Sequence, residues 1–301
     1  MSDVHPLASV VISTHNRCDL LARCLSSVRT LHYPRYEVIV VESASTGAQL
    51  VAARFGARYV AEPKPGLSRA RNTGARHARG DIVAFLDDDT VVHPRWLQAI
   101  VSEFDDSAVM GVAGQVLATD GGTDAWSFRR ADRRVVANTD PDWFEVTNFG
   151  GIGNGPNVSI RRAAFDVWPG FDERLGTGCV LAGSDEHNAF FKLVQRGFRV
   201  VSTPDAIVFH DASGSRVTSE KRRLQAIRDG TAYLLLLMIE ERGHRWRALR
   251  YGLEALVGKR RSWRPAVRPA VHPAPRPGLV GPVIEVMRAP AVAIQTAARR
   301  V

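Results

Sequence analysis

The chain has 301 residues, of which 45% are hydrophobic and 24% are charged, which is enough apolar material for one large domain with an appendage. Its formal net charge of +9 is unevenly distributed. Residues 216–301 hold eighteen Lys or Arg against six Asp or Glu (+12), whereas residues 1–215 hold twenty-two against twenty-five (−3). This distribution argues against a nucleic-acid-binding catalytic face. It favours contact of the C-terminal part with anionic lipid or an acidic partner.

The cysteine content and the apolar runs bear on the compartment. Cys18, Cys24 and Cys179 form neither an even disulfide framework nor a paired zinc-ligand spacing. Residues 1–6 lack the order of a signal peptide, and the longest uncharged apolar run, 233–239, is far shorter than the ~20 residues of a membrane span. We therefore expect a soluble, cytoplasmic protein, or one peripheral to the inner face of the membrane.

Strand and helix patterns alternate along the first part of the chain. Apolar runs predict strands at residues 9–13, 37–42, 58–61, 81–87 and 110–117, and helical periodicity predicts helices at 20–31, 48–55, 67–78 and 96–104. This alternation indicates an α/β domain with a mainly parallel central sheet flanked by helices. Residues 119–146, rich in Asp, Arg and Trp, are expected to form an inserted surface loop or lid.

The predicted central strand ends on three consecutive carboxylates, Asp87, Asp88 and Asp89. Adjacent carboxylates repel one another unless a positive group neutralises them. A divalent cation, Mg²⁺ or Mn²⁺, would do so, because these ions prefer oxygen ligands and are commonly shared with a substrate diphosphate. The alternative is a strand that runs into an acidic, solvated turn.

Polar residues follow other predicted strands as well. Thr14, Asn16 and Arg17 come after the first strand, and Glu42 closes the second. Because the carboxyl ends of parallel strands share one edge, we expect these residues to converge with the acidic triplet. A glycine-rich dinucleotide fingerprint and a Gly-Lys-Ser/Thr phosphate loop are both missing from the sequence.

Four segments in this order resemble the family 2 glycosyltransferases with the GT-A fold: Ser13-Thr14-His15-Asn16-Arg17, Val40-Val41-Glu42-Ser43-Ala44-Ser45, Ala70-Arg71-Asn72 and Phe85-Leu86-Asp87-Asp88-Asp89. The resemblance covers about the first 215 residues. It implies a Rossmann-like fold in which Thr14, Asn16, Arg17 and Glu42 hold the nucleotide base. Relatives usually have Asp where this chain has Glu42, which leaves the base preference open. Arg71, Asp87 and Asp88 would contact the nucleotide sugar, and Asp89 would bind the metal.

The resemblance extends to three later segments. The glycine-rich stretch 150–157 is similar to the family's approach to the sugar, and it includes Asn157 as a nucleotide-sugar contact. His210, which ends the last predicted strand (204–210), would complete the metal site. Asp185 and Glu186 stand where relatives usually carry Glu-Asp with the second acid as catalytic base. Position favours Glu186 and residue type favours Asp185; we choose position. Simple capping of the following helix is the alternative.

The chain divides into three predicted parts. Residues 1–215 form the catalytic domain, with a nucleotide-binding half (1–118) and an acceptor half (146–215). Residues 216–258 form C-terminal helices, predicted at 224–241 and 246–257. In the tail, 259–301, Arg and Pro alternate over much of the length, so it is expected to be extended or disordered. The tail would be dispensable for chemistry, and serve either as a peripheral membrane contact or as a solvated extension.

The resemblance and the residue pattern predict a metal-dependent, inverting glycosyltransferase. It would move a sugar from a nucleoside-diphosphate sugar to a hydroxyl of a carbohydrate, lipid-linked or small-molecule acceptor. Two alternatives remain. Residues 87–91 also fit the Asp-x-Asp-x-Thr/Val loop of haloacid-dehalogenase-like phosphatases, although that loop normally follows the first strand. A non-catalytic protein that binds acidic polymers through its tail is the other.

Overall fold

The computed structural model describes residues 5–119, 129, 131–210 and 219–256, and it describes no side chains for residues 219–226, 255 and 256. The strands are β1 (Ala8–Thr14), β2 (Tyr36–Ser43), β3 (Arg58–Glu62), β4 (Ile82–Asp87), β5 (Thr90–Val92), β6 (Val109–Ala118), β7 (Arg134–Val136), β8 (Val158–Arg161) and β9 (Arg199–His210). The α-helices are α1 (Cys18–Val28), α2 (Ala48–Arg54), α3 (Leu67–His77), α4 (Trp96–Glu103), α5 (Trp143–Asn148), α6 (Asp185–Gln195), α7 (Ser219–Glu240) and α8 (Arg245–Leu256). Two short 3₁₀ helices, η1 (Gly155–Asn157) and η2 (Arg162–Asp166), flank β8.

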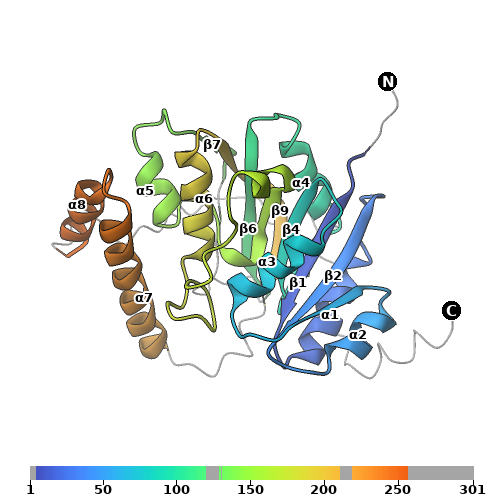
Figure 1. Cartoon of the computed structure of the whole chain (residues 1–301). Helices are drawn as coiled ribbons and strands as arrows, with labels where there is room; N and C mark the ends of the chain where they lie inside the picture. The colour runs from blue at the N-terminus through green and yellow to red at the C-terminus, as the bar shows by residue number, and fades with distance from the viewer. Residues whose placement is uncertain (1–4, 120–128, 130, 211–218, 257–301) are drawn as a thin grey trace.

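The strands form one mixed sheet in the order β3-β2-β1-β4-β8-β6-β9-β5, and β7 pairs with β9 (Figure 1). The expected parallel pairing holds for β3, β2, β1 and β4. Beyond β4 the pattern changes, because β8 runs antiparallel to both β4 and β6, while β6 and β9 are again parallel. The α/β class is confirmed, and the parallel half of the sheet is the one that brings the predicted nucleotide-binding residues to one edge.

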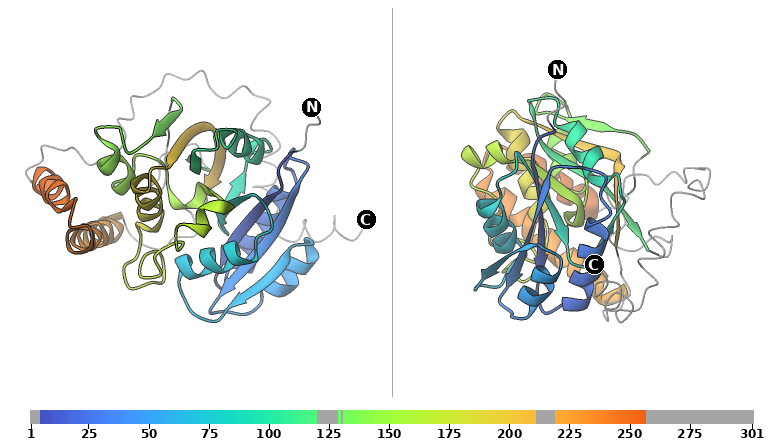
Figure 2. Two further views of the ribbon diagram at one scale, coloured as in Figure 1. Left: turned by 45° about the horizontal axis from the view of Figure 1, so that its top comes forward. Right: turned by 90° about the vertical axis from the view of Figure 1, so that its right-hand side faces the viewer.

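Helices cover both faces of the sheet (Figures 1 and 2). Alternate residues of β1 point to opposite faces, as the period of a strand requires: Val10 and Ile12 join one buried cluster, and Val11 joins the other. The first cluster includes apolar residues of α1, α2 and α4. The second includes residues of α3, α5, α6, α7 and α8. The result is a three-layer arrangement whose loops meet at the strand ends.

Gly74 allows α3 to approach the sheet closely. A Cβ atom at this position would lie 2.3 Å from Cγ1 of Val11 in β1, which is closer than real side chains come. The close approach carries Arg71, one turn earlier in α3, into the interior, where its side chain is wholly buried. A glycine in the middle of a helix therefore has a packing reason here.

The prediction of a surface loop over residues 119–146 is wrong for its second half. Residues 120–128 and 130 lie outside the described part, but β7 and most of α5 fall in the remainder. Trp143, Phe144 and Val146 are buried, and the Trp143 ring stacks on Phe191 of α6 with ring centroids 5.7 Å apart. Because the segment as a whole is polar, its short apolar run at 143–146, which packs against α6, was not recognised as a helix.

The helices predicted near 224–241 and 246–257 are present as α7 and α8, which pack against α5 and α6. The hydroxyl of Tyr233 donates to Oδ1 of Asn148 at 2.7 Å, and the Tyr251 ring stacks on Phe149 at 3.6 Å. Glu241 accepts hydrogen bonds from Lys192 and Gln195 of α6. The predicted boundary at 215 and the tail at 259–301 lie outside the described residues. None of the described helices has both the length and the apolar character needed to cross a bilayer.

Candidate active site

The strand ends bring the first set of predicted residues together. In the parallel register Thr14 of β1 lies opposite Glu42 of β2, and Ser13 lies opposite Asp87 of β4. The loop after β1 turns sharply at Asn16, whose φ of 54° is in the left-handed region that Asn tolerates better than most residues. Thr14, Glu42 and Asp87 therefore share the carboxyl edge of the parallel half, as the sequence predicts.

Asp88 is held by the loop after β1. Thr14 donates from Oγ1 to Asp88 Oδ2 at 2.7 Å, and Arg17 donates from Nη1 to Asp88 Oδ1 at 3.2 Å. The same Nη1 lies 2.9 Å from Asp89 Oδ2. Burial raises the pKa of Asp88 to about 6, with the neighbouring carboxylate of Asp89 adding to the effect and Thr14 opposing it. Arg17, whose side chain is half exposed, thus neutralises part of the triplet from the solvent side.

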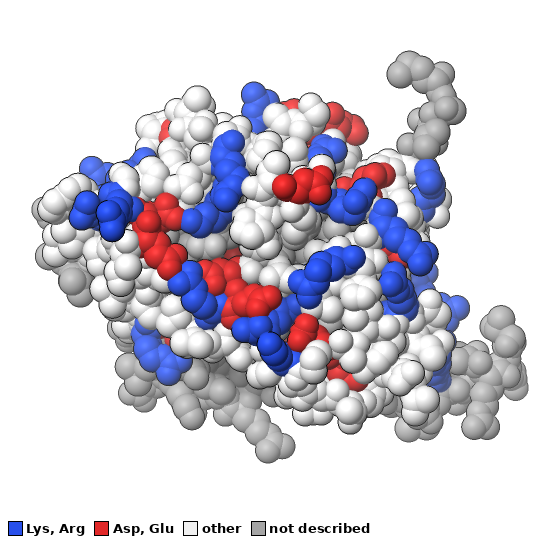
Figure 3. Space-filling model, viewed as in Figure 1, with Lys and Arg blue, Asp and Glu red and all other residues white. Residues whose placement is uncertain are grey.

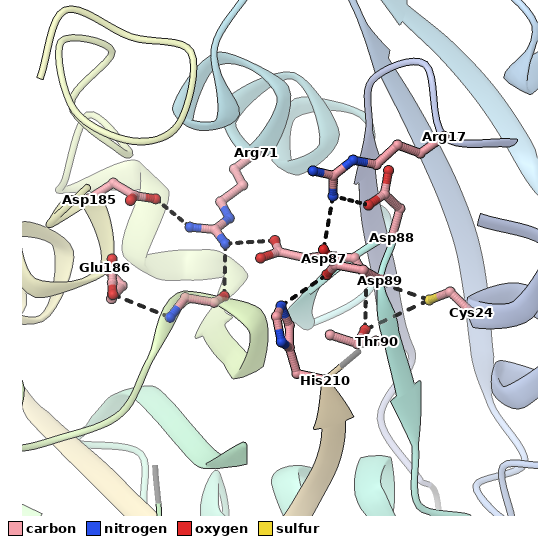
Figure 4. A network of polar contacts seen from close by, with 11 residues as sticks. Arg17, Cys24, Arg71, Asp87, Asp88, Asp89, Thr90, Asp185, Glu186 and His210 are labelled. Carbon is pink, nitrogen blue, oxygen red and sulfur yellow. Dashed lines mark hydrogen bonds and ion pairs between the residues drawn. The ribbon is translucent and has the colours of Figure 1, made fainter. Parts of the chain in front are cut away.

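Asp89 and His210 lie side by side (Figure 4). Nε2 of His210 is 3.4 Å from Oδ1 of Asp89, because β5 pairs with β9 and sets Thr90 opposite His210. Oδ1 of Asp89 is buried and accepts no hydrogen bond. A carboxylate oxygen and an imidazole nitrogen this close could both ligate Mn²⁺, whereas Mg²⁺ would use the carboxylate oxygen. Across the described residues no cluster of three or more His, Cys, Asp or Glu side chains could hold a metal, so further ligands would have to come from substrate or water.

Glu42 is buried and bound within the protein. Its carboxylate accepts hydrogen bonds from the Ser45 hydroxyl at 3.1 Å, the Ala48 backbone N–H at 3.1 Å and the Tyr59 hydroxyl at 2.9 Å. The N–H of Ala48 belongs to the first turn of α2, so Glu42 satisfies a helix end. A contact between Glu42 and a nucleotide base stays a prediction, and it would have to compete with these three donors.

Arg71 connects the acidic triplet to the Asp185-Glu186 pair. From α3 its guanidinium donates to Asp185, to Asp87 Oδ1 at 3.1 Å and to the Gly155 carbonyl at 2.8 Å (Figure 4). Although burial alone would lower its pKa, Asp185 and Asp87 hold the pKa of Arg71 above its ordinary value. Arg71 is therefore a fixed positive charge between two acidic segments that are far apart in sequence.

The two adjacent acids of α6 have different surroundings. Asp185 is ion-paired with Arg71, whereas Oε1 of Glu186 accepts a 3.3 Å hydrogen bond from the Gly155 N–H. Burial raises the pKa of Glu186 to about 8, and the negative charge of Asp185 adds to it. His187 Nε2 lies 3.8 Å from Glu186 Oε1, and burial lowers the pKa of His187 to about 4. Glu186 is therefore a buried carboxyl that holds its proton more tightly than an ordinary Glu.

The prediction that Asn157 contacts the nucleotide sugar does not fit the structure. The side chain is wholly buried, its Nδ2 donates to the carbonyls of Gln115 and Ala206, and its Oδ1 accepts from Trp96 Nε1, all at 2.9 Å. Each polar atom of the amide therefore has protein partners. Asn157 ties β6, β9 and α4 together, and leaves no group for a ligand.

Sequence analysis did not identify two residues that contribute to the site. The backbone carbonyl of Gly155 accepts a hydrogen bond from Arg71, and its backbone N–H donates one to Glu186. A Cβ atom at this position would lie 3.2 Å from Nη2 of Arg71. Ser184, with φ of 62°, directs the chain into the first turn of α6. The glycine-rich stretch 150–157 predicted that another group lies close to its backbone, but the sequence does not indicate that these groups are the side chains of Arg71 and Glu186.

The charge on the visible face is mixed. Acidic and basic side chains alternate over the face shown in Figure 3, without a large area of one sign. This agrees with the net charge of −3 for residues 1–215.

A comparison with known families assigns this site to a class. The family model for Glycosyl transferase family 2 matches residues 9–168, which include the loop after β1, Arg71 and the acidic triplet. The chain belongs to this family. Membership decides against both alternatives drawn from the sequence, the haloacid-dehalogenase-like phosphatase and the non-catalytic binder, because the matched relatives are glycosyltransferases.

Individual proteins that are similar in sequence to this family 2 glycosyltransferase are also glycosyltransferases. The glycosyltransferase AglE of Haloferax volcanii is 35% identical over 224 residues, which is 70% of this chain and 69% of AglE. The pre-mycofactocin glycosyltransferase of Mycobacterium tuberculosis is 28% identical over 216 residues, 69% of this chain but 43% of that protein. The chain thus spans less than half of the second relative.

Solved structures share the fold. The mannosyltransferase PcManGT from Pyrobaculum calidifontis, in complex with GDP-Man and Mn²⁺, superimposes with a TM-score of 0.59 at 19% identity, covering 99% of this chain and 85% of its own. Staphylococcus aureus TarS 1–349 in complex with UDP-GlcNAc gives 0.55 at 18% identity, covering 76% and 66%. The GT-A fold expected from the sequence is confirmed.

Proposed function

We propose that the protein is a metal-dependent, inverting glycosyltransferase that moves a sugar from a nucleoside-diphosphate sugar to an acceptor hydroxyl. One observation carries the proposal: the buried Arg71 joins Asp87, next to the Asp89 and His210 pair, to Asp185, next to Glu186. The two candidate metal ligands and the candidate base are thereby held on two sides of one guanidinium. Donor activation and acceptor deprotonation need such a separation.

The donor end of the site would be the loop after β1 with the acidic triplet. Thr14 and Arg17 each donate a hydrogen bond to Asp88 at the sheet edge, and the exposed Asn16 lies between them in the loop after β1. Arg17 can exchange one of its carboxylate contacts for a ligand phosphate, because its side chain is half exposed. That PcManGT binds GDP-Man and TarS binds UDP-GlcNAc supports a nucleotide-sugar donor for this chain, without choosing between the two bases.

Asp89 and His210 would hold the divalent cation. The buried Oδ1 of Asp89, which accepts no hydrogen bond, and the imidazole 3.4 Å away fit such an ion, and the Mn²⁺ in the PcManGT complex supports the choice of metal. When bound, the ion supplies charge stabilisation for the departing diphosphate, an effect worth several kcal/mol. Arg17 adds a second positive charge on the solvent side of Asp89.

Glu186 would act as the base. Its carboxylate removes the proton from the acceptor hydroxyl as the new bond between that oxygen and the anomeric carbon forms, and the bond from this carbon to the diphosphate oxygen breaks on the opposite face. Attack from the opposite face inverts the anomeric configuration. The raised pKa matches this role, because a base is most effective when its pKa is near the working pH.

Turnover assays test the proposal. The release of nucleoside diphosphate from a panel of sugar donors is measured with Mn²⁺ or with excess chelator, for the wild type and for Asp89→Asn and His210→Ala. We expect chelation and Asp89→Asn to abolish release and His210→Ala to weaken it, with folding retained, because both groups lie at strand ends. Full activity in chelator would refute the metal role. Retention of anomeric configuration in an isolated product would refute inversion.

A further inference from the structure

The hairpin of α7 and α8 exposes large apolar side chains. Five of them make up what we call the outer face, with these exposed fractions: Leu235 49%, Ile239 73%, Trp246 76%, Leu249 37% and Leu253 54%. They are half of the large hydrophobic residues that are exposed in the described part of the chain. Because such residues are usually scattered singly, their concentration on two adjacent helices calls for an explanation.

Helical geometry puts these side chains on the side of the hairpin away from the core. In α7, Tyr233 and Leu237 are buried, and Leu235 and Ile239 follow each of them by two residues, about 200° around the helix. In α8, Ala248 is buried, whereas Trp246, Leu249 and Leu253 recur at the spacing of one stripe on the opposite side. A Cβ at Gly252 would touch Leu234, so the two helices lie side by side.

Arginines border the outer face. Arg242, Arg245 and Arg250 are all exposed, and Arg250 remains 65% exposed although it lies 3.6 Å from Glu254 and 3.8 Å from Glu145. Glu240, the acid at the end of α7, is already paired with Arg174. Figure 3 shows basic side chains at the end of the molecule where α8 lies. An apolar stripe with Trp and Leu, bordered by Arg, is typical of a helix that lies in a membrane interface.

We propose that the outer face docks on an anionic lipid bilayer surface. The five apolar side chains enter the boundary between headgroups and acyl chains, and the bordering arginines pair with lipid phosphate and carboxylate groups. Charge complementarity favours this occupant over an apolar protein partner, because residues 219–256 carry a net +3 and residues 259–301, which follow the hairpin in the sequence, carry a net +8. The proposal stands independently of the transfer reaction, since no residue of the outer face belongs to the site.

Docking would also orient the site. The hairpin packs on α5 and α6, through Tyr233 with Asn148 and through Glu241 with Lys192 and Gln195. α6 begins at Asp185 and Glu186, so the docked hairpin carries the acceptor side of the site with it (Figure 1). Of the acceptor classes expected from the sequence, a lipid-linked one fits this placement best.

Vesicle sedimentation of the full chain tests the proposal. Phosphatidylcholine vesicles with and without phosphatidylglycerol are compared at low salt, for the wild type, a Trp246→Gln/Leu253→Gln double variant and a Leu50→Gln/Val180→Gln control. The control residues are 81% and 87% exposed but lie outside the hairpin. We expect the wild type and the control to bind anionic vesicles, and the hairpin variant to bind at least ~10-fold more weakly with an unchanged melting temperature.

A third variant isolates the charge. Arg245→Gln/Arg250→Gln should weaken binding to anionic vesicles and flatten its salt dependence. The proposal fails if the wild type ignores anionic vesicles. It fails equally if the hairpin variant binds as well as the wild type, which would assign binding to other basic residues. Light scattering that shows a wild-type dimer and a monomeric hairpin variant would identify a second copy as the occupant instead.

Discussion

At the scale of single residues, the two acids that begin α6 are chemically distinct although they are adjacent. Asp185 forms an ion pair with the buried Arg71. Glu186 instead accepts a hydrogen bond from the backbone N–H of Gly155 and lies next to His187, whose pKa is lowered by burial. Asp185 is thus held by an ion pair, and Glu186 is the acid whose pKa is raised by burial.

Replacing each acid by its amide should separate these roles. Glu186→Gln should lower kcat at least ~100-fold with little change in donor affinity, because a positioned base acts mainly in the transition state. Asp185→Asn should instead reduce the free energy of unfolding by about 3 kcal/mol, since it leaves the buried Arg71 short of a counter-charge. Steady-state kinetics and urea unfolding measure both. If Asp185→Asn shows the kinetic pattern and Glu186→Gln does not, the assignment is wrong.

The pH dependence of Glu186 gives a second prediction. A base must be deprotonated, so kcat/KM should rise with pH through an apparent pKa near 8, well above that of an ordinary carboxyl. The folded chain binds this proton more tightly than the unfolded chain, so the same group destabilises the fold as pH rises from about 4.5 towards 8. Glu186→Gln should therefore raise the melting temperature at pH 8 but not at pH 4. A difference independent of pH would contradict the raised pKa.

At the scale of elements, α3 is the helix whose placement decides the site. It is pressed against β1 at Gly74, and its Arg71 thereby reaches Asp87 on β4 and Asp185 on α6. Asn157 fixes η1 and α4 in a similar way, by bonding Trp96 and two strand carbonyls. For Arg71 and Asn157, close packing of elements sets the position of the polar group.

A matched pair of glycine substitutions tests this. Gly74→Ala should cost about 1–3 kcal/mol of unfolding free energy, because the added methyl would overlap Val11 and push α3 away from the sheet. Gly230→Ala in α7 meets nothing within 4 Å, so it should stabilise by about 0.5–1 kcal/mol through helix propensity. Denaturant melts of both variants provide the measurement. Equal effects of the two substitutions would show that Gly74 has no packing role.

The same contacts explain what the sequence could and could not predict. Thr14, Arg17 and the acidic triplet were predictable, because parallel strands bring whatever follows them to one edge. The Arg71 to Asp185 pair spans 114 residues, and no local pattern encodes it. Asn157 was misassigned because an Asn in a glycine-rich stretch looks the same whether its amide bonds a ligand or, as here, Trp96 and two carbonyls.

At the scale of the whole molecule, the candidate site and most of the excess positive charge belong to different parts of the chain. The site lies at the strand ends of the α/β layer, and the outer face lies on the α7–α8 hairpin with the basic residues beyond it. The division into a catalytic domain (1–215), C-terminal helices and tail stays a prediction, since its boundaries fall at or beyond the limits of the described residues.

Truncation after Gly258 should leave the chemistry intact. The removed residues 259–301 carry nine Lys or Arg and one acid, and the site contacts all involve residues before 211. Each basic residue near an anionic leaflet contributes about 1 kcal/mol, so the truncated chain should bind anionic vesicles more weakly through its remaining hairpin. Turnover and sedimentation of the same samples check both statements. A loss of turnover in the truncated chain would show that the tail belongs to the catalytic unit.

The most direct test of the central claim, a metal-dependent nucleotide-sugar site at Asp89 and His210, is thermal unfolding with a panel of nucleoside-diphosphate sugars, with and without Mn²⁺. A ligand at ~100 times its dissociation constant stabilises by about 2.7 kcal/mol, which is readily detected. We predict that at least one donor raises the melting temperature of the wild type in Mn²⁺, and that Asp89→Asn loses this shift. No shift with any donor, or an equal shift in chelator and in Asp89→Asn, would contradict the claim.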